Sequence, residues 1–194
     1  MFSLDDFNII LASQSPRRQT LLKELGINFI TKSADIDESF SSNLVKEEIP
    51  LFLANAKAEA MQTSLKTNDI LITADTIVWL GERAINKPKD RSDAFEMISE
   101  LSGNCHTVYT GVQLTNLQKK VSFFSETKVF FSELEASEIN YYLDTFKPYD
   151  KAGAYGIQEW IGYVGVERIE GSYFNVMGFP VHQVYQQLKQ FIFK

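Results

Sequence analysis

The residues best suited to chemistry near the start of the chain lie in the segment 13–18, which reads Ser-Gln-Ser-Pro-Arg-Arg. Ser15 is a favourable helix N-cap and Pro16 a favourable first helical residue, so we expect a helix to begin here. Free N–H groups at a helix start and arginine side chains both bind phosphate oxygens. The segment therefore predicts a polyphosphate site, with a solvated arginine pair as the alternative. The candidate groups are the hydroxyls of Ser13 and Ser15, the helix N-terminus and the guanidinium groups of Arg17 and Arg18.

A single acidic residue interrupts an otherwise apolar stretch. Asp75 lies within 70–80, where both flanks are aliphatic and Thr76 follows it. An ionised carboxylate is costly to bury without a partner, and a metal ion or a lysine would remove that cost. The position favours a functional carboxylate inside a strand over the alternative, a strand that ends at Thr73 and turns at Asp75.

Other charged residues are candidates to partner this carboxylate or a phosphate. Lys57 lies on or beside the apolar face of a predicted helix, where a solvent-facing lysine is not expected, although a snorkelling lysine is the alternative. Lys87 comes after the strand 70–80 and a short hairpin-like segment, so it could return toward the same end of the sheet. Alone, it is weak evidence for a phosphate site. Glu38 belongs to the acidic segment 35–38, which by itself is better explained as a solvated loop.

Small residues surround a lysine and an amide in the segment 151–158. Its glycines let backbone approach a ligand closely, and Gln158 could bind the edge of a base, but a glycine-rich surface turn explains the segment equally well. His106 and His182 have no third ligand at zinc spacing, so each is expected to be packed or solvated. Cys105, the single cysteine, is expected to be a buried structural thiol.

Composition limits the possible classes of protein. The chain has 194 residues, 44% of them hydrophobic, which suffices for one substantial core. It carries 19 Lys and Arg against 25 Asp and Glu, and this net charge of −6 argues against nucleic acid and anionic membranes as partners. The aliphatic runs are far shorter than the roughly 18 residues of a membrane span. One cysteine fits a reducing cytoplasm.

The elements expected to position these residues alternate between strands and helices. We expect strands at 7–12, 27–31, 70–80, 105–117 and 121–131, and helices at 16–25, 49–65, 92–101, 135–146 and 181–192. Ser132 and Glu135 resemble a capping box, and 151–180 reads as a loop-rich segment with short strands. The pattern predicts one α/β domain over residues 1–194, with a mixed twisted sheet that contains one antiparallel pair and is flanked by helices.

Taken together, these segments resemble the Maf family of nucleoside triphosphate pyrophosphatases. They follow one another in the family's order over almost the whole chain, as 9–18, 54–58, 74–78, 86–88, 101–112, 150–158 and 171–180. Several ordered blocks are much more specific than any one of them.

The resemblance implies a Maf/ITPase-like fold and hydrolysis of the α–β phosphoanhydride of a nucleoside triphosphate, with Mg²⁺ or Mn²⁺ as cofactor. Cations would neutralise the triphosphate, and the metal with Asp75 would orient water for in-line attack. The matching positions are Asp75 for the proton acceptor, Lys57 and Lys87 for catalytic phosphate handling, Ser13, Arg17 and Arg18 for phosphate binding, and Glu38 with Asp75 for the metal.

Three further positions bear on the base. The family branch similar to dTTP/UTP pyrophosphatases carries Arg, Thr and Gln there, and this chain has Arg17, Thr76 and Gln158. The branch associated with 7-methyl-GTP shows Trp, Gln and Glu instead. The chain departs from the common pattern at 159–160, where a small residue often follows the glutamine, and at Phe179, where leucine is usual.

The resemblance thus implies a cytoplasmic housecleaning enzyme that removes dTTP, UTP or modified pyrimidine nucleotides. The alternatives are the 7-methyl-GTP branch and a nucleotide-binding regulator of cell division or septum formation with little turnover. Turnover is favoured by the retention of Asp75, Glu38, Lys57 and Lys87, because a pure binder needs cations for phosphate but no general base. The expected partners are the nucleotide and, because the family often forms dimers, a second copy of the chain.

Overall fold

The computed structural model describes residues 4, 6–34 and 36–193, which fall into two compact units. Unit 1 comprises Met1–Asp75, Thr110–Ser125 and Gly178–Lys194, and unit 2 comprises Thr76–Tyr109 and Glu126–Met177. Three long strands each contribute residues to both units: β3 (Asp69–Leu80), β5 (Cys105–Thr115) and β6 (Lys120–Phe131). The expectation of one domain over the whole chain stays a prediction.

A mixed seven-stranded sheet runs in the order β2-β1-β3-β5-β6-β7, with β4 paired to β3. The shorter strands are β1 (Asn8–Ala12), β2 (Ile30–Lys32), β4 (Arg83–Ile85) and β7 (Val166–Glu170). β1 pairs in parallel with β2 and β3, whereas β3 with β4 and β6 with β7 are antiparallel. The α/β class with a mixed sheet is confirmed, and the sheet contains more antiparallel pairing than the one pair expected.

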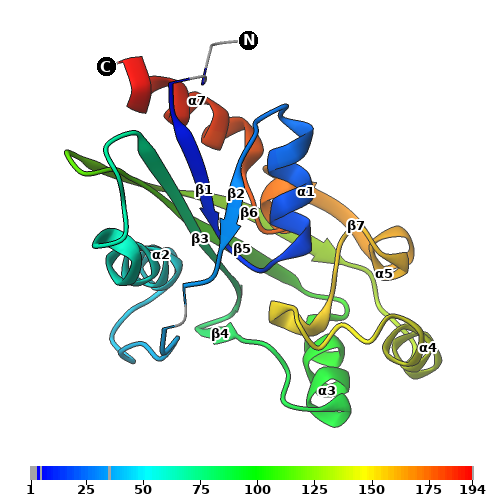
Figure 1. The fold of residues 1–194 in the computed structure, drawn as a ribbon. Coiled ribbons are helices and arrows are strands. Elements are labelled where there is room, and N and C mark those ends of the chain that lie inside the picture. Colours follow the sequence, from blue (N-terminus) through cyan, green and yellow to red (C-terminus); the bar gives the residue numbers. More distant parts are fainter. Residues whose placement is uncertain (1–3, 5, 35, 194) are drawn as a thin grey trace. The chain divides into compact units, whose positions relative to one another are not determined.

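Three helices pack on the strands of unit 1: α1 (Pro16–Glu24), α2 (Glu48–Gln62) and α7 (Val181–Phe193). Figure 1 shows α2 on one side of β1 and α1 on the other. Ile10 and Leu71 pack with Ala58 and Met61 of α2. The neighbouring strand residues alternate to the opposite face and are buried as well, because both faces carry helices.

The start and end of α1 follow from its sequence. The Ser15 hydroxyl accepts a hydrogen bond from the backbone N–H of Arg18 at 3.5 Å, and Pro16 occupies the first helical position. Gly26 has a φ of 71°, the left-handed conformation that glycine adopts without steric cost after a helix end. Both predicted ends of this helix are therefore confirmed.

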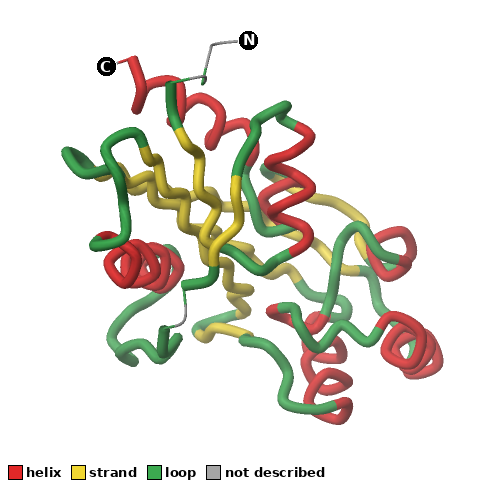
Figure 2. Tube along the Cα trace, in the orientation of Figure 1, coloured by secondary structure: helices red, strands yellow, loops and turns green. Residues whose placement is uncertain are grey.

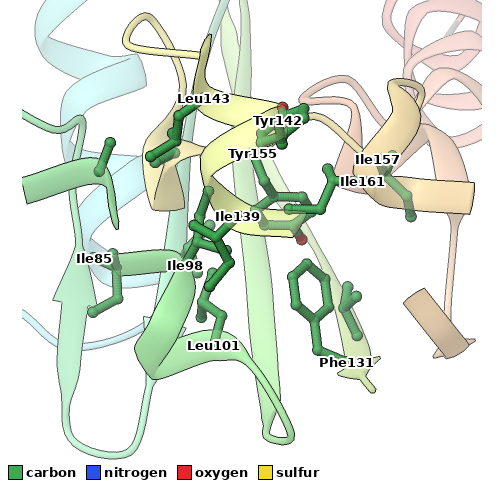
Figure 3. Close-up of a cluster of buried hydrophobic side chains, with 14 of the residues drawn as sticks. Ile85, Ile98, Leu101, Phe131, Ile139, Tyr142, Leu143, Tyr155, Ile157 and Ile161 are labelled. Carbon is green, nitrogen blue, oxygen red and sulfur yellow. The ribbon is translucent and has the colours of Figure 1, made fainter. Parts of the chain in front are cut away.

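Unit 2 contains four helices and one short 3-10 turn: α3 (Arg91–Leu101), α4 (Ala136–Phe146), η1 (Ala152–Ala154), α5 (Trp160–Val164) and α6 (Tyr173–Val176). Its core brings Ile98 and Leu101 of α3 together with Ile139 and Tyr142 of α4, as Figure 3 shows. Phe131 of β6 contributes to the same cluster. The residues of this cluster are nearly all aliphatic or aromatic, so hydrophobic burial holds unit 2 together.

Two local expectations in unit 2 were wrong. The segment after α4, drawn largely as loop in Figure 2, contains the short helices α5 and α6 besides the strand β7. Elements of four or five residues carry too little periodicity to be recognised from sequence. The capping box of α4 is formed by Glu135 and Glu138 rather than by Ser132 and Glu135, and the Glu138 carboxylate accepts the N–H of Glu135 at 2.8 Å.

None of the helices in the described part of the chain combines the length and apolar character needed to cross a bilayer.

The adjacent residues Cys105 and His106 have opposite environments. Cys105 is exposed, which corrects the expectation of a buried thiol: alternate residues of a strand face opposite sides, and Cys105 faces outward at the first position of β5. His106 is buried, its Nε2 lies 2.7 Å from the Tyr155 hydroxyl, and its ring meets those of Phe131 and Tyr155 edge-on. Burial lowers the pKa of His106 to about 4.

We expect His106 to make the stability of the protein depend on pH. Its pKa is about 4 when folded and about 6.5 when unfolded, so the unfolded state binds the extra proton, and stability is lost as the pH falls from 6.5 towards 4. Between pH 7 and 5 this loss amounts to about 2 kcal/mol. The free energy of unfolding of His106→Gln, measured with urea, should fall by about 2 kcal/mol less than that of wild type over the same pH range.

The control is His182→Gln, because His182 is the other histidine of the chain and is exposed. The free energy of unfolding of wild type minus that of His106→Gln is compared at pH 7 and at pH 5. If this difference is the same at both pH values, His106 is not held neutral by the fold.

Candidate functional site

A buried lysine with two carboxylate partners is the centre of the candidate site in unit 1. Lys57 Nζ lies 2.5 Å from Asp75 Oδ1 and 2.8 Å from Glu38 Oε1. The side chains of Lys57 and Asp75 are 10% and 14% exposed, whereas Glu38 is 47% exposed. Two predicted catalytic residues and a predicted metal ligand are therefore brought together. Asp35, in the same acidic segment as Glu38, lies outside the described residues.

Asp75 lies inside a continuous strand, as predicted, and not at a turn. In β3 the preceding residues are buried, whereas Asp75 and Thr76 are partly exposed. The strand continues through the buried residues Ile77 and Val78 to Leu80. A continuous strand inside the sheet therefore presents the carboxylate at the point where its burial is interrupted.

Helix α2 is held close to the sheet by two backbone contacts. The Thr73 hydroxyl donates to the carbonyl oxygen of Ala54 at 2.7 Å, which fixes α2 to β3 one turn before Lys57. Gly111 of β5 faces the first turn of the helix, where a Cβ would lie 2.5 Å from the carbonyl carbon of Pro50. A glycine is required there because any side chain would collide with the backbone of α2.

This close approach changes which face of α2 is buried. The apolar residues that recur at helical spacing in 49–65 include Phe52, Ala56 and Ala60, but Phe52 and Ala60 are exposed. The small residues Ala54 and Ala58 face the core instead, because a helix so near the sheet has no room for a phenylalanine. Lys57 consequently lies within the buried face of the helix.

The phosphate-binding candidates lie where β1 ends and α1 begins. Ser13 is buried, and its hydroxyl accepts the N–H of Ser15 at 3.2 Å. Gln19 reaches back to the carbonyl oxygen of Ser13 at 3.2 Å, which fixes this short connection. Arg17 is partly exposed at the first turn of the nine-residue helix. A hydroxyl, a guanidinium and the positive end of a helix dipole can together hold an anion.

The guanidinium of Arg18, the third candidate, donates hydrogen bonds to backbone carbonyl oxygens of the protein. Its Nε donates to the carbonyl oxygen of Gly178 at 2.8 Å, and its Nη1 donates to that of Ala74 at 2.9 Å. Burial lowers the pKa of Arg18, and the nearby charge of Asp75 opposes this effect. The side chain thus joins α1 to the residue that precedes Asp75 and to the segment that precedes α7.

The carboxylates of unit 1 suit a divalent metal that is bound together with substrate oxygens. One oxygen of Glu38 and one oxygen of Asp75 both contact the ammonium group of Lys57, so the two carboxylates already share one cation. Carboxylate oxygens are the ligands of Mg²⁺ and Mn²⁺, and Mg²⁺ is commonly held by one or two carboxylates plus phosphates. Within the described residues no group of three or more His, Cys, Asp or Glu side chains converges, so phosphate oxygens would have to complete the shell.

Three predicted residues belong to unit 2: Thr76, Lys87 and Gln158. β4 returns antiparallel to β3 and pairs Ile85 with Val78, and the exposed Lys87 follows two residues later. Gln158 is partly exposed as a residue, but its Oε1 is buried and has no hydrogen-bond partner among the residues that the structure describes. A buried amide oxygen of this kind remains available for one hydrogen bond.

A polar network beside Gln158 could not be recognised from the sequence. The buried Lys151 forms an ion pair with Glu159 at 3.1 Å. The Tyr142 hydroxyl donates a hydrogen bond to Glu159 and accepts one from the backbone N–H of Gly156 at 3.0 Å. Burial and then the bond to Glu159 raise the pKa of Tyr142 above its ordinary value. The one sequence signal for this network was an acidic residue, Glu159, directly after Gln158. Tyr142 could not be distinguished from an ordinary core residue.

Known proteins match this chain over nearly its whole length. A family model described as Maf-like protein matches residues 8–191. A dTTP/UTP pyrophosphatase of Bacteroides fragilis is 51% identical over 97% of this chain and 98% of the relative, and one of Parabacteroides distasonis is 50% identical over the same shares. Among solved structures, the Ham1 protein of Staphylococcus aureus has a TM-score of 0.44 and 14% identity, and the match covers 65% of this chain and 72% of that one.

Substitution of Gly111 tests how α2 is held. Gly111→Ala should lower the free energy of unfolding by about 3 kcal/mol, because the added methyl group meets backbone that no side-chain rotation can move. Gly81→Ala is the control, since its Cβ has no atom within 4 Å and its positive φ alone should cost about 1 kcal/mol. Urea denaturation measures both. A fully stable Gly111→Ala protein would contradict the close contact between β5 and α2.

Proposed function

This chain belongs to the Maf family, and we propose that it is a pyrophosphatase that hydrolyses dTTP and UTP to the nucleoside monophosphate and pyrophosphate. Relatives about half identical to it over almost their full length bear the name dTTP/UTP pyrophosphatase. The observation that carries the proposal is the ion-paired group of Asp75, Lys57 and Glu38 in unit 1. Modified pyrimidine nucleotides fall within the same proposal.

In this proposal Asp75 is the proton acceptor. Its carboxylate takes a proton from water as the water oxygen bonds to phosphorus at the α–β anhydride. The bond from phosphorus to the bridging oxygen breaks, and pyrophosphate leaves with the electron pair. Lys57 pairs with the partly buried carboxylate of Asp75 and adds positive charge beside the phosphates.

The phosphate chain would be held at the start of α1. Ser13 and Arg17 lie at the N-terminal end of the helix, where the helix dipole stabilises negative charge. From unit 2 we assign Lys87 to phosphate handling, on the basis of the family resemblance. Arg17, Thr76 and Gln158 are the proposed determinants of base preference, and they favour dTTP and UTP over 7-methyl-GTP.

Glu38 and Asp75 would hold Mg²⁺ or Mn²⁺ together with phosphate oxygens. A divalent metal bound there would neutralise phosphate charge and lower the pKa of a bound water. We further propose a cytoplasmic, housecleaning role, which one free cysteine and a nucleotide substrate support, and a homodimer as the assembly.

The reaction is tested with a panel of nucleoside triphosphates that resolves pyrophosphate from orthophosphate. Wild-type protein with Mg²⁺ should release pyrophosphate from dTTP and UTP, and Asp75→Asn should slow this about 1,000-fold, because it removes the general base. Asp144→Asn is the matched control, since Asp144 is exposed and pairs with Arg91 in unit 2.

The pattern of products separates the alternatives. Pyrophosphate mainly from 7-methyl-GTP would refute the base assignment and leave the reaction intact. Nucleotide binding without hydrolysis would refute the enzyme and favour a regulator.

The metal proposal predicts a loss of activity on chelation. EDTA should abolish pyrophosphate release, and Mg²⁺ or Mn²⁺ should restore it. Glu38→Gln should raise the Mg²⁺ concentration for half-maximal rate about tenfold, because one carboxylate ligand is lost. Glu59→Gln, on the exposed side of α2, serves as the control. Full activity in EDTA would rule out the metal.

A further inference from the structure

Arg18 differs from its neighbour Arg17 in what its guanidinium binds. Its Nε and Nη1 donate to the carbonyl oxygens of Gly178 and Ala74 at 2.8 and 2.9 Å. Both acceptors are backbone groups of unit 1, and Ala74 directly precedes Asp75 in β3. Two donors of the side chain are thus committed to the protein itself.

The carbonyl of Ala74 lies where β3 extends past its parallel neighbour β1. The paired register of the two strands ends with Leu11 and Ile72, and β1 itself ends at Ala12. Ala74 is fully buried, so its backbone carbonyl needs a donor that β1 no longer supplies. Arg18 provides that donor from α1.

Arginine is chemically suited to this arrangement. The guanidinium is planar, and its donors point in fixed directions, so one side chain can hold two carbonyls that come from separate segments. A lysine ammonium carries the same charge but is a flexible point donor without that geometry. The two bonds of Arg18 therefore constrain the position of β3 at Ala74 relative to Gly178.

We propose that Arg18 is a positioning residue that fixes the β3 backbone at Ala74, and thereby the place of the Asp75 carboxylate, rather than a phosphate ligand. The inference rests on the proposed function, in which Asp75 accepts the proton from water. It separates two adjacent arginines that the family resemblance groups together: Arg17 binds phosphate, and Arg18 aligns the carboxylate.

The test compares Arg18→Met, Arg18→Lys and Arg17→Met by their kcat and KM for UTP and by inhibition with pyrophosphate. Arg18→Met should lower kcat about 100-fold, because a small displacement of a catalytic group has effects of that size. Its KM and its Ki for pyrophosphate should stay within about threefold of wild type. Arg17→Met should raise both about tenfold or more, because a phosphate ligand is lost.

Arg18→Lys should recover part of kcat, since one donor can still reach a carbonyl. Should Arg18→Met fail to fold in a thermal unfolding assay, the same comparison is decided with Arg18→Lys. A rise in the Ki for pyrophosphate equal to that of Arg17→Met, with kcat retained, would overturn the positioning role. Absence of pyrophosphate release from UTP by the wild type would instead refute the proposed function and, with it, this inference.

Discussion

The candidate site of unit 1 depends on the burial of one ammonium group. Lys57 lies in the apolar face of α2, where an unpaired charge would be far too costly to keep. Two carboxylates from separate parts of the chain, Asp75 in β3 and Glu38 in the segment before α2, must therefore meet it. Removal of Asp75, the more buried partner, would leave Lys57 with only the half-exposed Glu38 to compensate its charge. The need to compensate the buried ammonium thus brings together groups suited to phosphate chemistry.

Contacts made by the main chain set the precision of this arrangement. Gly111 lets α2 approach β5 with no intervening side chain, and Thr73 fixes the same helix to β3. Arg18 supplies donors to carbonyls at a place where the strand ladder has ended. Backbone positions vary less than side-chain rotamers, so a site anchored in this way is held more rigidly than one built from side-chain contacts alone.

Much of this organisation could be predicted from the residues. The conflict between Asp75 and its aliphatic surroundings located the strand and its carboxylate, and the cap at Ser15 located α1. Charges placed against their surroundings are informative because burial penalises them individually. The resemblance to a family added Glu38 as a metal ligand, which the acidic segment alone did not indicate.

Other features could not be predicted because they depend on contacts between distant segments. The buried face of α2 differs from the apolar stripe because Gly111, which is distant in sequence from the helix, decides how closely the helix packs. Tyr142 looked like a core residue, and its bond to Glu159 depends on the course of the intervening loop. Free cysteines are usually buried, so Cys105 was expected to be buried as well. It is exposed, because the alternation of side chains along β5 places it on the outer face.

The order of the segments along the chain has a consequence for how the protein is made. Unit 2 ends at Met177, whereas unit 1 still needs Gly178 and α7. Synthesis from the N-terminus therefore supplies every residue of unit 2 first, although unit 1 contributes the earliest strand. Arg18 is translated early but meets its second carbonyl only when Gly178 has been added. The setting of Asp75 is thus completed only after every residue of unit 2 has been synthesised.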